Sequence, residues 1–309
     1  MHCVLIYNPA SGRKPNLRTG KVREIANALS DLGHRVELTA TKAPGSATGQ
    51  TSEAVRNGAD VVFACGGDGT IHEVLQGLVS EIGEPTAILG IIPLGSANAL
   101  ARHLRLSLDP LRAALQQINS AVQTIPIGKV AYYGQARYFA VMAGAGPDGA
   151  LAYSLLTGNK SKLGRLAYYL LAARLFATRR FDPFEVEYTE AASGDIVRQR
   201  AVSAMAVRVG SLGGLFRTLT GGMASIHDTD LELIMVSPPA WLSLPMWFFS
   251  SWLNLRGLNR FIRSAQVSTF SCRPLSSSSP HFQADGECLG GIPMQVSIVQ
   301  NALRILMPS

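Results

Sequence analysis

The chain has 309 residues, of which 47% are hydrophobic and 16% are charged. This length and composition suffice for two packed domains and exclude an intrinsically disordered chain. The formal net charge of +7 favours an anionic partner, such as a nucleic acid, an acidic membrane face or a phosphorylated ligand. Because no nucleic-acid-binding module is recognisable, we expect no nucleic acid among the partners.

The opening segment, residues 3–7, is a short apolar run followed by Asn-Pro, which predicts a strand and not a signal peptide. The most apolar later stretch, residues 241–255, is shorter than the roughly 20 residues that span a bilayer. The four cysteines form no CxxC pair, which favours small buried thiols in a reducing compartment over disulfides or a zinc site. We therefore expect a cytoplasmic protein and leave open peripheral contact with the inner membrane face.

The first part of the chain alternates short apolar runs with helix-like segments. Strands are predicted at residues 3–7, 36–39, 61–64 and 87–92, and helices at residues 17–32, 46–57, 71–79 and from about 98. This alternation predicts a Rossmann-like α/β domain with a parallel sheet. Ligands bind such sheets where loops leave the carboxyl ends of the strands. The polar, glycine-containing loops at residues 8–12, 66–70 and 95–98 therefore predict a nucleotide site.

From residue 128 the pattern changes to short β-branched or aromatic segments separated by turns. Strands are predicted at residues 129–133, 137–143, 184–189, 198–208, 231–236, 266–270 and 294–299, and helices at residues 162–177 and 241–263. These segments predict a mostly β second domain, either a sandwich or a distorted barrel. We place the domains at residues 1–127 and 128–309 and leave open whether the last residues return to the first domain.

The segment Gly66-Gly67-Asp68-Gly69-Thr70 stands between a predicted strand and a predicted helix. Glycines let backbone N–H groups approach phosphate oxygens, and the helix N-terminus adds positive charge. This context predicts a phosphate-binding turn, with a tight structural turn as the alternative. The chain lacks GxxxxGK[ST], HRD and DFG, and this turn is not GxGxxG, so a P-loop enzyme, a protein kinase and a dehydrogenase are disfavoured.

Six motifs occur in an order that resembles the diacylglycerol kinase catalytic-domain family, and its bacterial soluble lipid kinases in particular. They are Asn8-Pro9-Ala10-Ser11-Gly12, the Gly66-to-Thr70 turn with Glu73, Pro93-Leu94-Gly95-Ser96-Ala97-Asn98 with Ala101-Arg102, Gly144-Ala145-Gly146-Pro147-Asp148, Leu163-Gly164-Arg165-Leu166-Ala167-Tyr168, and Asp285-Gly286-Glu287. The glycine turn is shared with NAD kinases and 6-phosphofructokinases, whereas the last motif and the β-rich second half point to the lipid-kinase branch. The resemblance covers nearly the whole chain and implies an ATP-dependent kinase that phosphorylates the hydroxyl of a diacylglycerol-like lipid.

The resemblance also implies an ATP site in a cleft between the domains. The residues that would contact the nucleotide are Asn8, Ser11, Gly12, Thr41, Gly66, Gly67, Asp68, Gly69, Thr70, His72, Ser96 and Asn98. Asp285 would be the general base that accepts the proton of the lipid hydroxyl, with Glu287 assisting or sharing the role. The structural alternative is that Asp285-Gly286 is only a hairpin turn.

Mg²⁺ is the cofactor that the resemblance implies beside ATP. Asp68 and Asp148 would hold the ion that bridges the phosphates, because hard oxygen ligands suit Mg²⁺. For Asp148 the alternative is an ordinary Asp-Gly turn. Some relatives hold a second, structural Mg²⁺ near an Asp-Asp-Gly-x-Leu-Asp segment, which corresponds here to residues 227–232. Asp228 is the candidate ligand there, although His227 and Thr229 depart from that pattern.

Two helical segments predict contact with lipid. Basic residues beside residues 163–177 and aromatic residues within residues 241–255 favour transient contact with a membrane surface, with ordinary packing as the alternative. A homodimer is left open. Two other functions stay open: an NAD-kinase-like enzyme with a soluble substrate, and a non-catalytic nucleotide- or lipid-binding regulator, which the departures at His72 and Ala97 from the family pattern allow.

Overall fold

The computed structural model describes residues 1–9, 15–79, 85–157, 174–175, 180–209, 224–252 and 260–308. The chain divides into two compact units, unit 1 with Met1–Ile127 and Val299–Ser309, and unit 2 with Gly128–Ile298. The boundaries fall within strands β5 (Ala121–Tyr132) and β15 (Met294–Met307). Ser11, Gly12 and most of the predicted helix at residues 162–177 lie outside the described residues.

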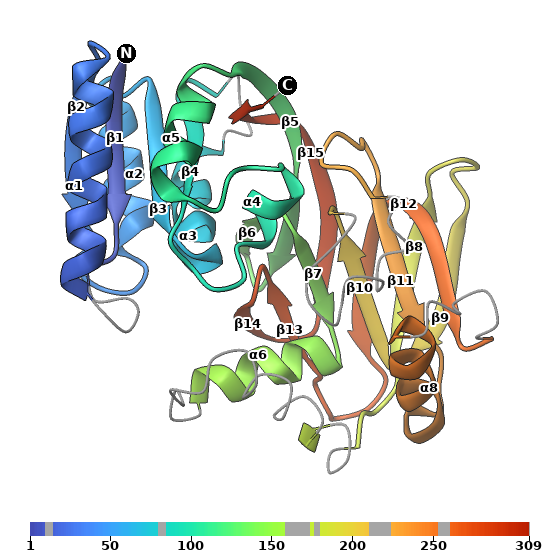
Figure 1. Ribbon diagram of the computed structural model, residues 1–309. Coiled ribbons are helices and arrows are strands. Elements are labelled where there is room, and N and C mark those ends of the chain that lie inside the picture. The colour runs from blue at the N-terminus through green and yellow to red at the C-terminus, as the bar shows by residue number, and fades with distance from the viewer. Residues whose placement is uncertain are drawn as a thin grey trace. The chain divides into compact units, whose positions relative to one another are not determined.

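Unit 1 contains a parallel sheet with helices beside it (Figure 1). Its strands β1 (His2–Tyr7), β2 (Arg35–Ala40), β3 (Val61–Gly66) and β4 (Ile88–Pro93) lie in the order β4-β3-β1-β2, and the end of β15 pairs in parallel with β4. Every residue of β3 and β4 is buried, as expected for parallel strands with covered faces. These four strands confirm the α/β prediction.

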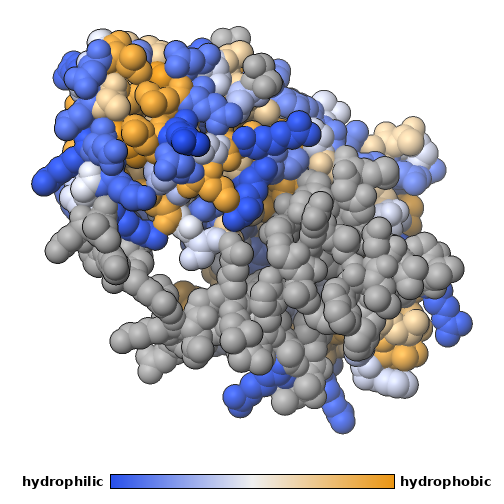
Figure 2. Space-filling model, viewed as in Figure 1, coloured by the Kyte–Doolittle hydropathy of each residue, from blue (hydrophilic) through white to orange (hydrophobic). Residues whose placement is uncertain are grey.

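Among its described residues, unit 1 has five helices. They are α1 (Pro15–Asp31), α2 (Ser46–Arg56), α3 (Asp68–Leu78), α4 (Ala99–His103) and α5 (Pro110–Ile118). Helix α5 was not predicted, although Asp109 and Pro110 are typical residues for a helix start. The Asp109 side chain accepts the Arg112 N–H at 2.9 Å, and Pro110 occupies the first helical position. Figure 2 shows apolar surface among hydrophilic side chains over the part of unit 1 formed by α1 and α5.

Unit 2 is built mainly from antiparallel strands (Figure 1). The strands are β6 (Gln135–Phe139), β7 (Met142–Ala145), β8 (Phe184–Glu190), β9 (Ile196–Ala201), β10 (Ser203–Val207), β11 (Leu231–Val236), β12 (Ile262–Pro274), β13 (His281–Ala284) and β14 (Glu287–Gly291). They pair in the order β14-β13-β7-β10-β11-β12-β15, with β8 on β12 and β9 on β8. The core includes Phe184, Phe270 and Phe282. A mostly β second half is therefore confirmed.

Some predicted elements of unit 2 were wrong in detail. The single strand predicted at residues 198–208 is two strands, because β9 pairs with β8 whereas β10 pairs with β7 and β11. The strand predicted at residues 137–143 divides in the same way into β6 and β7. Asp148, predicted in a loop, lies in the first turn of α6 (Pro147–Thr157). The aromatic helix α8 (Ala240–Trp252) does not reach residue 263, which belongs to β12.

Candidate active site

The carboxyl ends of β1 and β2 bring two predicted nucleotide residues to neighbouring positions. Tyr7 pairs in register with Ala40, so Asn8 and Thr41 follow adjacent strands at the same edge of the sheet. The Thr41 N–H donates a hydrogen bond to the Tyr7 carbonyl at 2.8 Å. The expectation that polar loops meet at one edge therefore holds for these two residues.

The loops that follow β3 and β4 touch each other backbone to backbone. The Leu94 N–H donates to the Gly66 carbonyl at 2.9 Å. A Cβ atom added to Gly95 would lie 2.4 Å from the Gly67 Cα and 2.6 Å from the Asn98 Oδ1. Contacts this close leave no room for a side chain, so the glycines here are required by the approach of two backbones.

Asn98 and Asp68 hold these two loops together. Asn98 has φ of 51°, in the left-handed region, and its side chain accepts the Gly95 N–H and donates to the Gly95 carbonyl, both at 3.0 Å. The Asp68 carboxylate accepts the N–H groups of Asn98 at 3.0 Å and Ala99 at 2.7 Å. Asp68 therefore places a negative charge at the start of α4, where it is stabilising.

The N-terminus of α3 faces the same turn. Its N-cap residue is Gly67, which has no side chain with which to cap the helix, and the Thr70 and Ile71 N–H groups donate to the Gly67 carbonyl. Gly69 is exposed, and a Cβ atom added there would meet nothing within 4 Å. A helix N-terminus bounded by glycines can accept a phosphate group.

The other residues predicted on this side differ in exposure. His72 is 4% exposed within α3, whereas Ser96 is exposed in the loop after β4. Glu73, part of the same sequence motif, accepts the Ala47 N–H at 3.1 Å and so holds the start of α2. Sequence reasoning missed Arg18 of α1, whose guanidinium donates to the Leu94 carbonyl, and no sequence pattern indicated it.

In unit 2, Asp285 and Gly286 form the two-residue turn between β13 and β14. Both have positive φ, 47° and 88°, as a type I′ hairpin turn requires. Asp285 is therefore the hairpin residue that the structural alternative described. Its side chain, however, points back into unit 2, so Asp285 makes contacts beyond the turn itself.

The Asp285 carboxylate binds the backbone at the junction of β6 and β7. Its Oδ2 accepts the Ala140 N–H at 2.8 Å, and its Oδ1 accepts the Val141 and Met142 N–H groups, both at 2.9 Å. These three bonds fix the plane of the carboxylate. Glu287, two residues on, is exposed, and its carboxylate lies 3.9 Å from the Arg137 guanidinium.

Asp148 is linked to this turn through Gln283, which sequence reasoning also missed. The Gln283 Nε2 donates to the Asp148 Oδ2 at 3.1 Å, and the Gln283 Oε1 accepts the Gly286 N–H at 2.7 Å. The Asp148 Oδ1 is buried and has no hydrogen-bond partner among the described residues. Burial raises the pKa of Asp148 to about 6, while the hydrogen bond from Gln283 acts in the opposite direction.

Residues 144–149 read GAGPDG, a GxGxxG pattern between a strand and a helix. The strand is β7, which is antiparallel to both of its neighbours, so this is not a dinucleotide-binding βαβ unit. The glycines serve close packing: a Cβ atom on Gly149 would lie 2.0 Å from the His281 carbonyl oxygen, and one on Gly144 would lie 2.5 Å from the Asp148 Oδ2. They bring α6 against β13 and Asp148 against Gln283.

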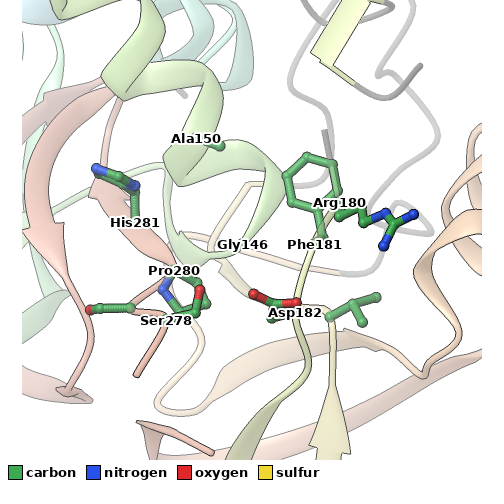
Figure 3. A pocket seen from close by; sticks show the side chains of 10 residues that line it. Gly146, Ala150, Arg180, Phe181, Asp182, Ser278, Pro280 and His281 are labelled. Carbon is green, nitrogen blue, oxygen red and sulfur yellow. The ribbon is translucent and has the colours of Figure 1, made fainter. Parts of the chain in front are cut away.

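A small hollow lies at the other end of β13 (Figure 3). Its volume is about 120 Å³, and in Figure 3 Arg180, Phe181 and Asp182 lie on one side of it and Pro280 and His281 on the other. Small-molecule sites usually have roughly 300–1,000 Å³. This hollow is therefore too small to enclose a lipid, and Asp285 follows the opposite end of the same strand.

Asp228, the predicted ligand of a structural metal, lies in a turn before β11. Its Oδ2 accepts the Ser225 N–H at 2.7 Å. The buried Arg208 donates to the backbone of the same turn. Within the described residues, no group of three or more His, Cys, Asp and Glu side chains could hold a metal ion.

Comparison with known proteins places these features in a family. The diacylglycerol kinase catalytic domain family matches residues 2–130. The diacylglycerol kinase of Bacillus subtilis strain 168 is 34% identical over 308 residues, which cover 98% of this chain and 95% of that protein. The diacylglycerol kinase of Staphylococcus saprophyticus is 31% identical over 308 residues, covering 99% and 95% of the two chains.

Two solved structures have a similar fold. The crystal structure of a diacylglycerol kinase from Bacillus anthracis strain Sterne matches with a TM-score of 0.74 at 22% identity, over 99% of this chain and 96% of that chain. The structure of yeast NADH kinase complexed with NADH matches with a TM-score of 0.50 at 10% identity, over 100% and 84%. At these identities the likeness concerns the fold alone. Within the described residues, no helix has the length and apolar character of a membrane span.

Proposed function

We propose that this chain, which belongs to the diacylglycerol kinase family and is therefore a kinase, transfers the γ-phosphate of ATP to the hydroxyl of a diacylglycerol-like lipid alcohol. The observation that carries the nucleotide part of this proposal is the glycine-bounded N-terminus of α3. It offers backbone N–H groups and a positive helix end to an anion at an exposed turn. Asn8 and Thr41 follow the neighbouring strands at the same edge, and Ser96 and Asn98 follow β4.

Mg²⁺ is proposed as the cofactor, with Asp68 and Asp148 as its ligands. When bound, the ion would neutralise charge on the transferring phosphate. The Asp68 carboxylate accepts two backbone N–H groups, and carboxylate oxygens are ligands that suit Mg²⁺. The buried Oδ1 of Asp148, which lacks a partner among the described residues, fits the same requirement.

Asp285 is proposed as the general base. Its three backbone donors hold the carboxylate in one orientation, and a carboxylate held in this way can take the proton of the attacking hydroxyl. Catalysis would then come from positioning the hydroxyl against the phosphate and from stabilising the charge that develops. Glu287 is exposed and is proposed only to assist.

Contact with a membrane surface is proposed for unit 2. Trp241 of α8 is 78% exposed and Leu156 of α6 is 70% exposed. Tryptophan favours the membrane interface. Trp241→Ala should lower binding to phosphatidylglycerol–phosphatidylcholine vesicles in a sedimentation assay, whereas Ile196→Ala, which removes a side chain of β9 that is 68% exposed, should not. Equal losses in both variants would contradict this site. A homodimer and an inner-membrane location stay predictions.

The test of the function is a phosphorylation assay with labelled ATP. The acceptors are diacylglycerol, a sphingosine-like base and phosphatidylglycerol in detergent micelles, with NAD as the soluble alternative. Label in a lipid supports the proposal, and label in NAD alone overturns it in favour of an NAD-kinase-like enzyme. ATP binding with no turnover on any acceptor would indicate a regulator.

Asp285 needs a variant whose loss of activity is not simply unfolding. Asp285→Asn keeps one oxygen for the Val141 and Met142 N–H groups but places an amide N–H₂ against the Ala140 N–H. Leaving a buried donor unpaired costs about 1–3 kcal/mol, so this variant should stay folded with a lower Tm. A folded, ATP-binding and inactive Asp285→Asn supports the base, whereas an active one excludes it.

A further inference from the structure

Arg208 is the largest fully buried side chain among the described residues, with 1% exposure. It follows β10 directly, and its own N–H donates to the Val141 carbonyl at 2.9 Å. No motif indicated this residue. Because a buried guanidinium is unfavourable without oxygen partners, the groups around it must explain its presence.

The partners of Arg208 are oxygens of the turn before β11. Its Nη2 donates to the Ile226 carbonyl at 2.7 Å, and its Nη1 lies 3.4 Å from the Asp228 carbonyl. Burial lowers the pKa of Arg208 to about 10, while the negative charges of Asp228 and Asp285 act in the opposite direction. At neutral pH the guanidinium is therefore charged.

This set of oxygens resembles the donor set of a hard divalent cation, which takes carboxylate and backbone carbonyl ligands. The family resemblance had predicted a structural Mg²⁺ at Asp228. The residues do not fit one, because the guanidinium of Arg208 donates to both carbonyls and the Asp228 Oδ2 accepts the Ser225 N–H. A metal bound there would also be repelled by the adjacent positive charge.

We propose that Arg208 is the built-in cation of this cluster and that it ties the turn at residues 226–228 to the segment at residues 140–142, positioning Asp285 without a metal ion. Arg208 and Asp285 both bind the backbone of this segment. The backbone N–H of Arg208 donates to the carbonyl of Val141, and the Asp285 carboxylate accepts the N–H groups of the same residue and its two neighbours. Arg208 is thus a positioning residue, and only its effect on catalysis rests on the proposed function.

The first test is thermal unfolding of nucleotide-free protein. Arg208→Ala leaves the Ile226 and Asp228 carbonyls without their donor and removes the positive charge near Asp228 and Asp285, so it should lower Tm by about 10 °C. Guanidinium chloride at about 10 mM, far below the molar range that unfolds proteins, should restore part of the loss. The control is Arg198→Ala, because Arg198 is an exposed arginine of the same unit paired with Glu187 at 2.5 Å. It should change Tm by about 2 °C at most and not respond to guanidinium.

The second test asks whether a metal is present. The Tm of nucleotide-free wild type should be the same in EDTA and in Mg²⁺. A Mg²⁺-dependent rise in the wild type that Asp228→Asn abolishes would overturn the proposal. An Arg208→Ala variant as stable as Arg198→Ala would overturn it as well. If Arg208→Ala does not fold, Arg208→Lys replaces it: one ammonium keeps the charge but cannot copy the planar fork, so an intermediate Tm is expected.

The third test is kinetic and separates positioning from mere stability. At a temperature where it is folded, Arg208→Lys should lower kcat by about tenfold to a hundredfold, because Asp285 is displaced, with the KM for ATP unchanged. Guanidinium should also raise the kcat of Arg208→Ala. A kcat equal to that of Arg198→Ala would exclude the positioning role. If the wild type phosphorylates no lipid, the proposed function fails, while the two Tm tests still decide whether Arg208 is the cation.

Discussion

The loop site of unit 1 (residues 66–70 and 95–98) and the carboxylate cluster of unit 2 (Asp148, Asp228 and Asp285, with Gln283 and Arg208) both use an aspartate that binds backbone N–H groups. In both, an aspartate accepts backbone N–H groups: Asp68 takes two at the start of a helix, and Asp285 takes three at a strand junction. Asp68 is separated from its partners by 30 and 31 positions, whereas Asp285 is separated by 143 to 145. Asp68 links neighbouring loops at one edge of the sheet, and Asp285 links parts of unit 2 that are distant in sequence.

The two settings also differ in the charge that they bury. At the loop site the Asp68 carboxylate meets the positive end of a helix, which stabilises it. In unit 2, Gln283 links Asp148 to the turn that contains Asp285. The buried Arg208 binds the turn that contains Asp228, and its positive charge acts on Asp228 and Asp285. We therefore expect removal of a charged side chain to be more damaging in unit 2 than in unit 1.

The largest effect is predicted for Asp285→Ala compared with Asp68→Ala. Asp285→Ala deprives three N–H groups of their acceptor and forces alanine into a positive φ, so it should lower the free energy of unfolding by about 4 kcal/mol. Asp68→Ala removes a helix cap and should lower it by about 1 kcal/mol. Calorimetry on the two variants measures the difference, and equal losses in the free energy of unfolding would show that the two carboxylates contribute equally to stability.

The same contrast explains what could be predicted from the sequence. The strands and helices of unit 1 follow an alternating pattern with glycine turns, and the predicted loops at residues 66–70 and 95–98 do meet. The pattern cannot show that Gly67 and Gly95 touch each other, because that contact depends on the spacing of two strands. Local signals at α5 were present and were overlooked, so that omission was not a limit of the sequence.

The carboxylate cluster was only partly predictable. Asp285 and Asp148 stand in recognisable motifs, but Gln283 and Arg208 stand in ordinary strand sequence, and their roles come from pairing partners far along the chain. The change of partners between β9 and β10 is likewise a tertiary effect. Residues whose function depends on long-range pairing leave no local pattern to read.

A smaller effect is predicted for Gly95→Ala, which tests the loop contact. The added Cβ would overlap the Gly67 Cα and the Asn98 side chain, so the loops must separate. Overpacking of this kind costs about 1–3 kcal/mol, and ATP affinity should fall with it. Gly20→Ala is the control, because that position lies inside α1 with nothing within 4 Å of the new methyl group, and it should be neutral or stabilising. A Gly95→Ala variant as stable as this control would contradict the close contact.

Asp148→Asn should change how stability depends on pH. The folded-state pKa of about 6 lies above the unfolded value of 3.8, so the folded state keeps its proton longer than the unfolded chain. Below pH 4 the carboxyl is protonated in both states and carries no penalty. As pH rises from about 4 to 6, the unfolded state gains stability from ionising and the native state loses relative stability, by on the order of 2 kcal/mol.

The measurement is the Tm of the wild type and of Asp148→Asn between pH 4 and pH 8 in EDTA. Asparagine does not ionise, so the Tm of the variant should increase relative to that of the wild type as pH rises from about 4 to 6. The buried amide of the variant has its own unpaired group, and for this reason the slope with pH, and not the absolute Tm, is the decisive quantity. A constant difference across the whole range would show that Asp148 titrates normally.

The smallest effect on stability, and the most direct question about function, belongs to Gly69→Ala. The position is exposed, has no positive φ and has nothing within 4 Å of an added Cβ, so Tm should stay within about 1 °C of the wild type. A methyl group there would nevertheless stand in the path of a phosphate approaching the α3 N–H groups. ATP affinity, measured by calorimetric titration, should fall by about tenfold or more, since one poorly accommodated phosphate contact is worth at least 1.4 kcal/mol. Unchanged ATP affinity in this folded variant would mean that glycines are needed in this turn only for packing against Gly95, and that the triphosphate binds elsewhere.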